Sequence, residues 1–299
     1  MKIEKTIAIY NFKGGVGKTT SAYNLACGWS KKYKVLVIDC DPQCNLTNTI
    51  LPNHKGKNSV YAYLREFVHN SIPSIEPIKI NSKLHIIPGH YNMIDLESNN
   101  QFIEFGTIMM QRFLKQIKAD YDIVLLDCPS YFGKTVKSVI ANVDGLLIPA
   151  TPDIFALKGA MKLMKHIKEL KRSQKLNVFG IFLNRFKKDL IYHRKIRVVA
   201  KRIFGSLILP QIIRNSVRIG ETTDPRFVRD EDDNPQNDVV NDFLALGEMI
   251  IRKTAPQDIE NFTLPTLVKT SASQDSKRPT HPGINRFRES LQSFGVSSA

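Results

Sequence analysis

The 299-residue sequence predicts an α/β fold, in which a doubly wound, mostly parallel β-sheet is flanked by helices. Short β-branched runs alternate with helix-length segments, and this alternation is typical of βαβ units. Near-continuous apolar stretches such as Ile123–Leu126 also indicate strands that are covered on both faces. The expected strands, in chain order, are Thr6–Tyr10, Val35–Asp39, Leu84–Pro88, Asp122–Asp127, Gly145–Pro149, Phe179–Asn184 and Ser206–Pro210.

Two helices can be placed with their buried sides. Ala22, Leu25, Ala26 and Trp29 follow the i, i+3, i+4, i+7 spacing of a helix whose apolar stripe faces the core. A second apolar helix is expected over Val239–Arg252. It closes the predicted folded domain, residues 1–253.

The composition changes after Lys253. Residues 254–299 are rich in Ser, Thr, Pro and Gln, which predicts a largely disordered, mobile C-terminal tail. Within it, Ile284–Phe294 has Ile284, Phe287, Leu291 and Phe294 at helical spacing and could form a short amphipathic helix.

Composition also limits the class of protein. No apolar run is long enough to span a membrane, and the first residues lack the apolar stretch of a signal peptide. The four cysteines lack the spacing of a zinc site and the density of a disulfide scaffold, so we expect them to be reduced and mostly buried. These features predict a cytoplasmic protein.

The positive charge is concentrated in one segment. Lys158–Arg218 contains 17 lysines and arginines against two acidic residues, so the net charge of this segment equals the formal net charge of the whole chain, +15. A surface of this density attracts a polyanion, either nucleic acid or an anionic membrane. A merely solvated face is the alternative.

The clearest motif is Asn11-Phe-Lys-Gly-Gly-Val-Gly-Lys-Thr-Thr20, which follows an expected strand and opens a helix, as a phosphate-binding loop requires. Glycines allow backbone N–H groups to close around phosphate oxygens at a helix N-terminus. Lys18 should reach the β- and γ-phosphates, and the Thr19 hydroxyl should coordinate magnesium. The expected nucleotide-binding residues are Lys13, Gly14, Gly15, Val16, Gly17, Lys18, Thr19 and Thr20.

This loop resembles the deviant Walker A motif of the ParA and MinD families of P-loop nucleotidases. Phe12 stands where the first glycine of a plain P-loop would be, and Lys13 precedes the double glycine. The resemblance implies that ATP and Mg²⁺ are the cofactors. It also implies that Lys13 reaches the phosphates of a partner subunit, so that ATP binding produces a sandwich homodimer.

Two further segments resemble motifs of the same families. Val35–Thr47 resembles a strand that ends in Asp-x-Asp-Pro-Gln, which implies that Asp41 orients the attacking water and Asp39 supports the magnesium region. A carboxylate at a strand end can hold a water in line without being a strong base. The families usually have glycine where Cys44 stands.

The third motif, Tyr121–Ser130, is similar to a Walker B strand that delivers Asp127 toward magnesium. A second proline is frequent where Ser130 stands. Lys13, Lys18 and Asp41 are the expected catalytic residues. Asn184 lies where related proteins contact adenine, and a helix-capping asparagine is the alternative.

Part of the basic segment resembles a DNA-binding region of the ParA/Soj-type proteins. Ile213–Thr222 aligns without a gap to that region, and Arg218 matches an arginine that contributes to sequence-independent DNA binding. Arg214 replaces the usual proline. Arg197 and Lys201 lie on the polar face of a predicted helix, which could contact phosphates as well.

Two functions follow from the resemblance. The first is a DNA-partitioning ATPase of the nucleoid, for plasmid or chromosome segregation: it binds double-stranded DNA non-specifically as an ATP dimer and hydrolyses ATP when a ParB-like centromere-binding partner stimulates it. The second is a MinD-like ATPase that a membrane holds through Ile284–Phe294. The location of the charge in the folded body favours the first, without stable membrane association.

Overall fold

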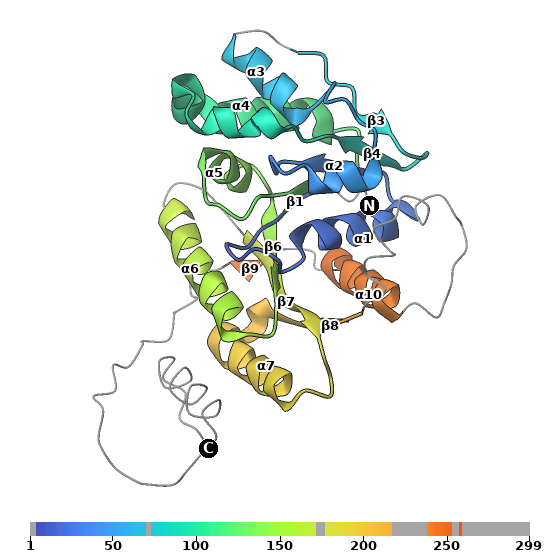
Figure 1. Ribbon diagram of the computed structural model, residues 1–299, viewed down its shortest axis with the longest axis vertical. Coiled ribbons are helices and arrows are strands. Elements are labelled where there is room, and N and C mark those ends of the chain that lie inside the picture. Colours follow the sequence, from blue (N-terminus) through green and yellow to red (C-terminus); the bar gives the residue numbers. More distant parts are fainter. Residues whose placement is uncertain (1–3, 70–72, 172–176, 217–237, 253–256, 259–299) are drawn as a thin grey trace.

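The computed structural model describes residues 4–69, 73–171, 177–216, 238–252 and 257–258 (Figure 1). The predicted amphipathic segment Ile284–Phe294 and the predicted DNA contact Arg218 lie outside these residues. Among the described residues, no helix combines the length and the apolar character needed to cross a bilayer.

The described strands form one sheet of nine strands (Figure 1). Its order is β3-β4-β2-β5-β1-β6-β7-β8, and β9 pairs with β7. The pairs β3–β4 and β7–β9 are antiparallel, and the others are parallel. The strands are β1 (Lys5–Ile9), β2 (Val35–Asp39), β3 (Ile78–Lys79), β4 (Leu84–Ile87), β5 (Ile123–Asp127), β6 (Gly145–Ala150), β7 (Asn177–Phe186), β8 (Ile208–Arg214) and β9 (Gln257–Asp258).

Each expected strand is present, most of them with slightly different bounds, and the largest difference is at β8. The segment expected as Ser206–Pro210 begins with a 3₁₀ turn, η2 (Gly205–Leu207), and the strand β8 runs from Ile208 to Arg214. Gly205 has a φ of 56°, which ends the preceding helix and turns the chain before the strand begins. The strand β9 lies beyond the predicted domain boundary at residue 253.

Helices cover both faces of the sheet, which confirms the doubly wound α/β fold (Figure 1). Alternate strand residues face opposite layers: Ile7 and Ile9 pack toward α1, while Ala8 and Tyr10 pack into the other layer. The first layer contains α1 (Lys18–Ser30), α2 (Asn45–Ile50) and α10 (Asp238–Arg252). The second contains α3 (Val60–Val68), η1 (Tyr91–Glu97), α4 (Asn100–Lys118), α5 (Lys134–Ile140), α6 (Ile154–Lys171) and α7 (Ile191–Phe204).

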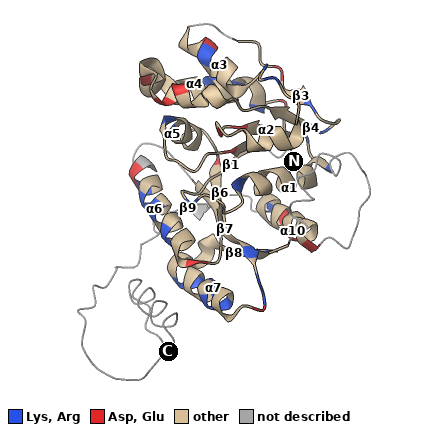
Figure 2. Cartoon of the chain, in the orientation of Figure 1, with Lys and Arg blue, Asp and Glu red and all other residues tan. Residues whose placement is uncertain are grey.

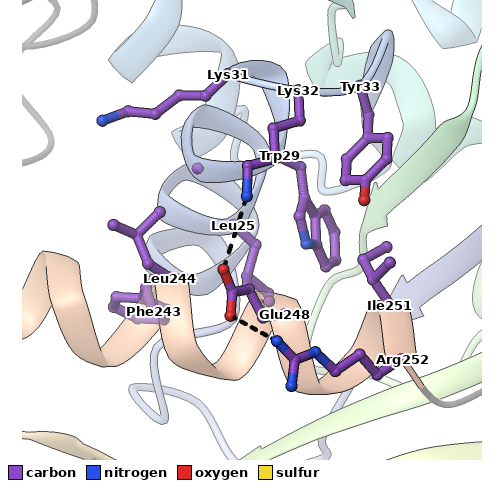
Figure 3. A pocket seen from close by; sticks show the side chains of 12 residues that line it. Leu25, Trp29, Lys31, Lys32, Tyr33, Phe243, Leu244, Glu248, Ile251 and Arg252 are labelled. Atoms are coloured by element: carbon purple, nitrogen blue, oxygen red, sulfur yellow. Dashed lines mark ion pairs between the residues drawn. The ribbon is translucent and has the colours of Figure 1, made fainter.

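Helices α1 and α10 pack closely at glycines, and all four residues of the predicted α1 stripe are buried. A Cβ on Gly28 or on Gly247 would meet Leu244 or Trp29, respectively, within 3 Å. Between the same helices lies a hollow of about 370 Å³, with Glu248 paired to Lys32 and Arg252 at its rim (Figure 3). Trp29 lies about 16 Å along α1 from Lys18, so this hollow is separate from the phosphate loop.

Arg214 joins β8 to the start of α10. Its guanidinium donates to both carboxylate oxygens of Asp242, at 2.8 and 3.0 Å, and to Asp238 at 2.7 Å. Its backbone N–H also donates to Asp242, which is buried. Arg214 is therefore a structural clamp between these two elements.

Replacing Arg214 by alanine is expected to lower the free energy of unfolding by about 2 to 3 kcal/mol, because Asp242 would stay buried without its cation. Urea unfolding measures this loss. The matched control is Arg252→Ala in α10, the helix that contains Asp242, since Arg252 is 83% exposed and makes a 3.6 Å pair with Glu248. That variant should change stability by less than about 0.5 kcal/mol. Equal losses in the two variants would contradict the clamp.

Candidate functional site

The predicted site residues meet at the carboxyl edge of the sheet, where open parallel sheets bind ligands. The strand β1 leads into the phosphate loop. Asp39 and Asp127 end the adjacent strands β2 and β5 and are directly paired in register. Asn184 lies near the end of β7. Residues that are far apart in the sequence are therefore neighbours at this edge.

The phosphate loop has the backbone that its glycines predict. Gly15 and Gly17 have φ values of 73° and 88°, in the left-handed region that glycine adopts without strain. Gly17 caps the N-terminus of α1, and the helix begins at Lys18. The loop thus leads directly into a helix N-terminus, which favours a bound anion.

Lys18 is buried at the edge of this loop, with a relative exposure of 7%. Its ammonium donates to the Ser130 hydroxyl at 2.6 Å and to the Lys13 carbonyl at 3.5 Å. Burial lowers the pKa of Lys18, although the carboxylates of Asp127 and Asp41 favour its charged form. A phosphate would supply the negative charge that this buried ammonium needs.

Asp127 has the features of a carboxylate that binds a cation. Its side chain is buried, and neither carboxylate oxygen has a hydrogen-bond partner among the described residues. Burial, followed by the charge of Asp39, raises the pKa of Asp127 well above its usual value, and the nearby Thr19 hydroxyl and Lys18 ammonium only partly offset this. The residues fit magnesium, which binds in nucleotide sites through one or two protein oxygens and phosphates. Thr19 and Asp127 would hold it.

Asp39 organises the loop behind that position. Its carboxylate accepts hydrogen bonds from the Thr47 backbone N–H at 2.9 Å, the Thr47 hydroxyl at 2.7 Å and the Asp41 N–H at 3.1 Å. Burial raises the pKa of Asp39 to about 6, against these hydrogen bonds. Because its oxygens are already engaged, Asp39 suits the supporting role that the sequence predicts for it.

Asp41 lies in the turn that follows, partly exposed. It accepts a hydrogen bond from the Gln43 N–H at 2.9 Å, and Cys44 caps the next helix with a φ of 52°. A left-handed conformation is one that glycine adopts more easily than other residues, in line with the glycine that the family resemblance implies at this position. The loop therefore keeps the glycine-type geometry with cysteine in place.

The four cysteines are free thiols, as expected. Cys40 and Cys128 are buried, whereas Cys27 and Cys44 are partly exposed, so the expectation of burial is met for two of them.

Lys13 is held within its own chain. Its ammonium lies 2.7 Å from the Asp153 carboxylate and 3.3 Å from the Thr151 hydroxyl. Burial raises the pKa of Asp153, but the hydrogen bonds from Lys13 and Thr151 outweigh it, and the pKa is held below its usual value. The ion pair is accessible, since the Lys13 side chain is 37% exposed.

Asn184 contacts the phosphate loop itself. Its amide donates to the Val16 carbonyl at 2.8 Å, and its oxygen accepts from the Arg185 N–H. A Cβ on Gly17 would collide with this amide. Since α7 is capped by Leu190, the helix-capping alternative for Asn184 does not hold. The contact with adenine stays a prediction.

The predicted DNA contacts lie on another surface. Arg197 and Lys201 are exposed on α7, whose opposite face buries Ile196, Val199 and Ile203, as the helical spacing predicts. Arg197 also donates to the Pro210 carbonyl at 3.1 Å. Lysines and arginines lie along both α6 and α7 (Figure 2).

The sequence motifs do not predict the partners of the site residues, which are Ser130, Thr47 and Asp153. Asp153 had a usable signal, because Thr151-Pro-Asp153 directly follows β6 at the same carboxyl edge. Ser130, in a loop, and Thr47, in α2, had none, because a lone hydroxyl carries no periodicity or spacing.

Comparison with known proteins gives the same family. A family model described as an AAA domain matches residues 4–178. An uncharacterized protein of Methanocaldococcus jannaschii is 31% identical, over 71% of this chain and 85% of that protein. The sporulation initiation inhibitor protein Soj of Bacillus subtilis is 28% identical, over 73% of this chain and 87% of Soj.

Among solved structures, a complex of a Cyanothece McdA variant with ATP has a TM-score of 0.72 and 22% identity. The match covers 84% of this chain and 97% of McdA, and at this identity it shows a shared fold. The phosphate loop and the paired aspartates at the strand ends point to the same family as the matching family model. The chain belongs to the AAA-domain family of P-loop proteins and is a ParA/Soj-type P-loop ATPase.

Proposed function

We propose that this protein is a DNA-partitioning ATPase that uses ATP and Mg²⁺. In the proposed cycle, ATP binding brings two copies of the chain together, and this dimer binds nucleoid DNA without sequence preference. A ParB-like partner then stimulates ATP hydrolysis, which releases the protein from DNA. Two relatives named for chromosome partitioning, the ATPase Soj of Treponema pallidum and the protein ParA of Myxococcus xanthus, support this assignment together with the family resemblance.

The observation that carries the proposal is the position of Lys13 beside the phosphate loop. Its ammonium is paired with Asp153 at 2.7 Å, yet the pair is partly exposed. Exposed ion pairs contribute about 1 kcal/mol or less, so Lys13 can leave Asp153 at little cost. The phosphates of a second subunit would be a stronger partner, because they carry more charge.

The basic surface supports the DNA-binding step. The helix α6 carries Lys162 and Lys165 on exposed positions, and α7 carries Arg194, Arg197 and Lys201 (Figure 2). Phosphate contacts need a positive ridge and no base-reading element. A dimer would present two such ridges, which doubles the number of phosphates within reach.

Sedimentation with DNA and with liposomes, each with and without ATP, tests the function. The proposal expects ATP-dependent co-sedimentation with any DNA sequence and none with liposomes of anionic lipid. ATP-dependent binding to liposomes alone would instead establish the MinD-like function.

Reversing the charge of the basic surface is expected to weaken DNA binding uniformly. In the variant with Arg197, Lys201 and Arg218 changed to glutamate, affinity should fall for every sequence. The log–log salt dependence should become shallower by about 0.9 per lost phosphate contact. Fluorescence anisotropy at several salt concentrations measures both.

The matched control reverses three exposed basic residues of α4, namely Arg112, Lys115 and Lys118, which changes the net charge equally. This control should keep most of its DNA affinity, and deletion of residues 254–299 should also have little effect. Equal losses in both triple variants would show that net charge, rather than this surface, determines binding.

A further inference from the structure

Ser130 lies beside the phosphate-binding lysine, Lys18. It lies three residues after Asp127, and its hydroxyl oxygen accepts a hydrogen bond from the Lys18 ammonium at 2.6 Å. Lys18 is buried, and its other hydrogen-bond acceptor among the described residues, the Lys13 carbonyl, is farther away at 3.5 Å. The serine thus stands where an acceptor for the phosphate-binding lysine is needed.

The same hydroxyl lies over the phosphate loop. A Cβ built on Gly14 would be 3.8 Å from the Ser130 oxygen, in ordinary van der Waals contact. An oxygen atom placed 2.8 Å from the Lys18 ammonium could also lie within hydrogen-bond distance of the hydroxyl, because the two groups are only 2.6 Å apart. One phosphate oxygen could therefore accept from both.

We propose that Ser130 is a γ-phosphate-binding residue that lets this chain distinguish ATP from ADP. The inference rests on the proposed binding of ATP at this loop. Without nucleotide, the Ser130 oxygen accepts from Lys18. With ATP bound, the ammonium donates to the phosphates, and the Ser130 hydroxyl donates its proton to an oxygen of the γ-phosphate.

The Ser130 hydroxyl is chemically suited to donate a hydrogen bond to the γ-phosphate, and not only to position Lys18. A hydroxyl that donates to an anionic oxygen makes a charge-assisted hydrogen bond, which is stronger than a neutral one. ADP lacks the γ-phosphate and cannot accept this bond. A serine that only held Lys18 would compete with both nucleotides, and its removal would then strengthen ATP and ADP binding alike.

Equilibrium titration of the full chain with Mg²⁺ and either a non-hydrolysable ATP analogue or ADP tests the proposal. The variants are Ser130→Ala, which removes the hydroxyl, and Ser130→Thr, which keeps it. We expect Ser130→Ala to reduce analogue affinity about tenfold or more while ADP affinity changes little, and Ser130→Thr to restore the ratio. Thermal melting checks that both variants are folded.

An unchanged ratio of the two affinities in Ser130→Ala, whether neither affinity changes or both change by the same factor, would overturn the inference and leave the proposed function intact. If the unmodified chain binds neither nucleotide, the proposed function itself fails, and the inference fails with it.

Discussion

Replacing Lys13 by alanine is expected to abolish the ATP-induced dimer while nucleotide binding remains measurable. In a symmetric dimer each subunit would supply one Lys13 to its partner's phosphates. Removing one member of a buried, hydrogen-bonded charge pair at an interface costs about 2 to 5 kcal/mol, and the variant loses two such contacts. The dimer dissociation constant should therefore rise by at least roughly 1,000-fold. Light scattering with and without ATP measures the change.

The control separates action across the interface from action within the chain. Asp153→Asn removes the charge that Lys13 contacts in its own subunit but keeps an oxygen that can accept from the Ala156 N–H at the start of α6. This variant should still dimerise with ATP. A dimerisation defect as severe as that of Lys13→Ala would show that Lys13 only stabilises its own subunit, and unchanged dimerisation of Lys13→Ala would exclude the sandwich.

Most of the sheet could be predicted from the sequence, because buried parallel strands are short apolar runs with β-branched residues. The run Val35–Asp39 is both the expected and the observed strand. The expected start of β8 lies two residues before the observed one, because Gly205, Ser206 and Leu207 form a 3₁₀ turn that the apolar run after it hides in the sequence. The strands β3 and β9 have two residues each, too few to show any periodicity.

In the candidate site, too, some residues could be predicted from the sequence and others could not. The motif residues Lys18, Asp39 and Asp127 could be predicted, because Lys18 opens the helix after the phosphate loop and the two aspartates end strands. Their partners could not, because those contacts depend on tertiary packing: Lys13 and Asp153 are 140 residues apart, and Lys18 and Ser130 are 112 apart. Arg214 is a further example, since its role follows only from the position of α10.

Replacing Asp41 by alanine is expected to stop ATP hydrolysis while ATP binding and the dimer persist. Asp41 contributes a carboxylate near Lys18 and Asp127 but, among the described residues, makes no hydrogen bond with the phosphate loop. Its proposed task is to orient the attacking water, and a misplaced nucleophile costs roughly 100-fold or more in rate. The variant should accumulate as an ATP-bound dimer that stays on DNA. Single-turnover hydrolysis and ATP-dependent DNA co-sedimentation measure the two effects.

Two further variants separate the chemical step from binding and from the shape of the loop. Asp41→Asn keeps an oxygen for the Gln43 N–H, which is 2.9 Å away, but removes the negative charge, and it should hydrolyse ATP as slowly as Asp41→Ala. Lys18→Ala should instead lose nucleotide affinity, because it removes the buried ammonium that faces the phosphates. Normal hydrolysis by Asp41→Ala would contradict a water-orienting role. Normal hydrolysis by Asp41→Asn alone would show that the hydrogen bond from Gln43, and hence the shape of the loop, matters rather than the charge.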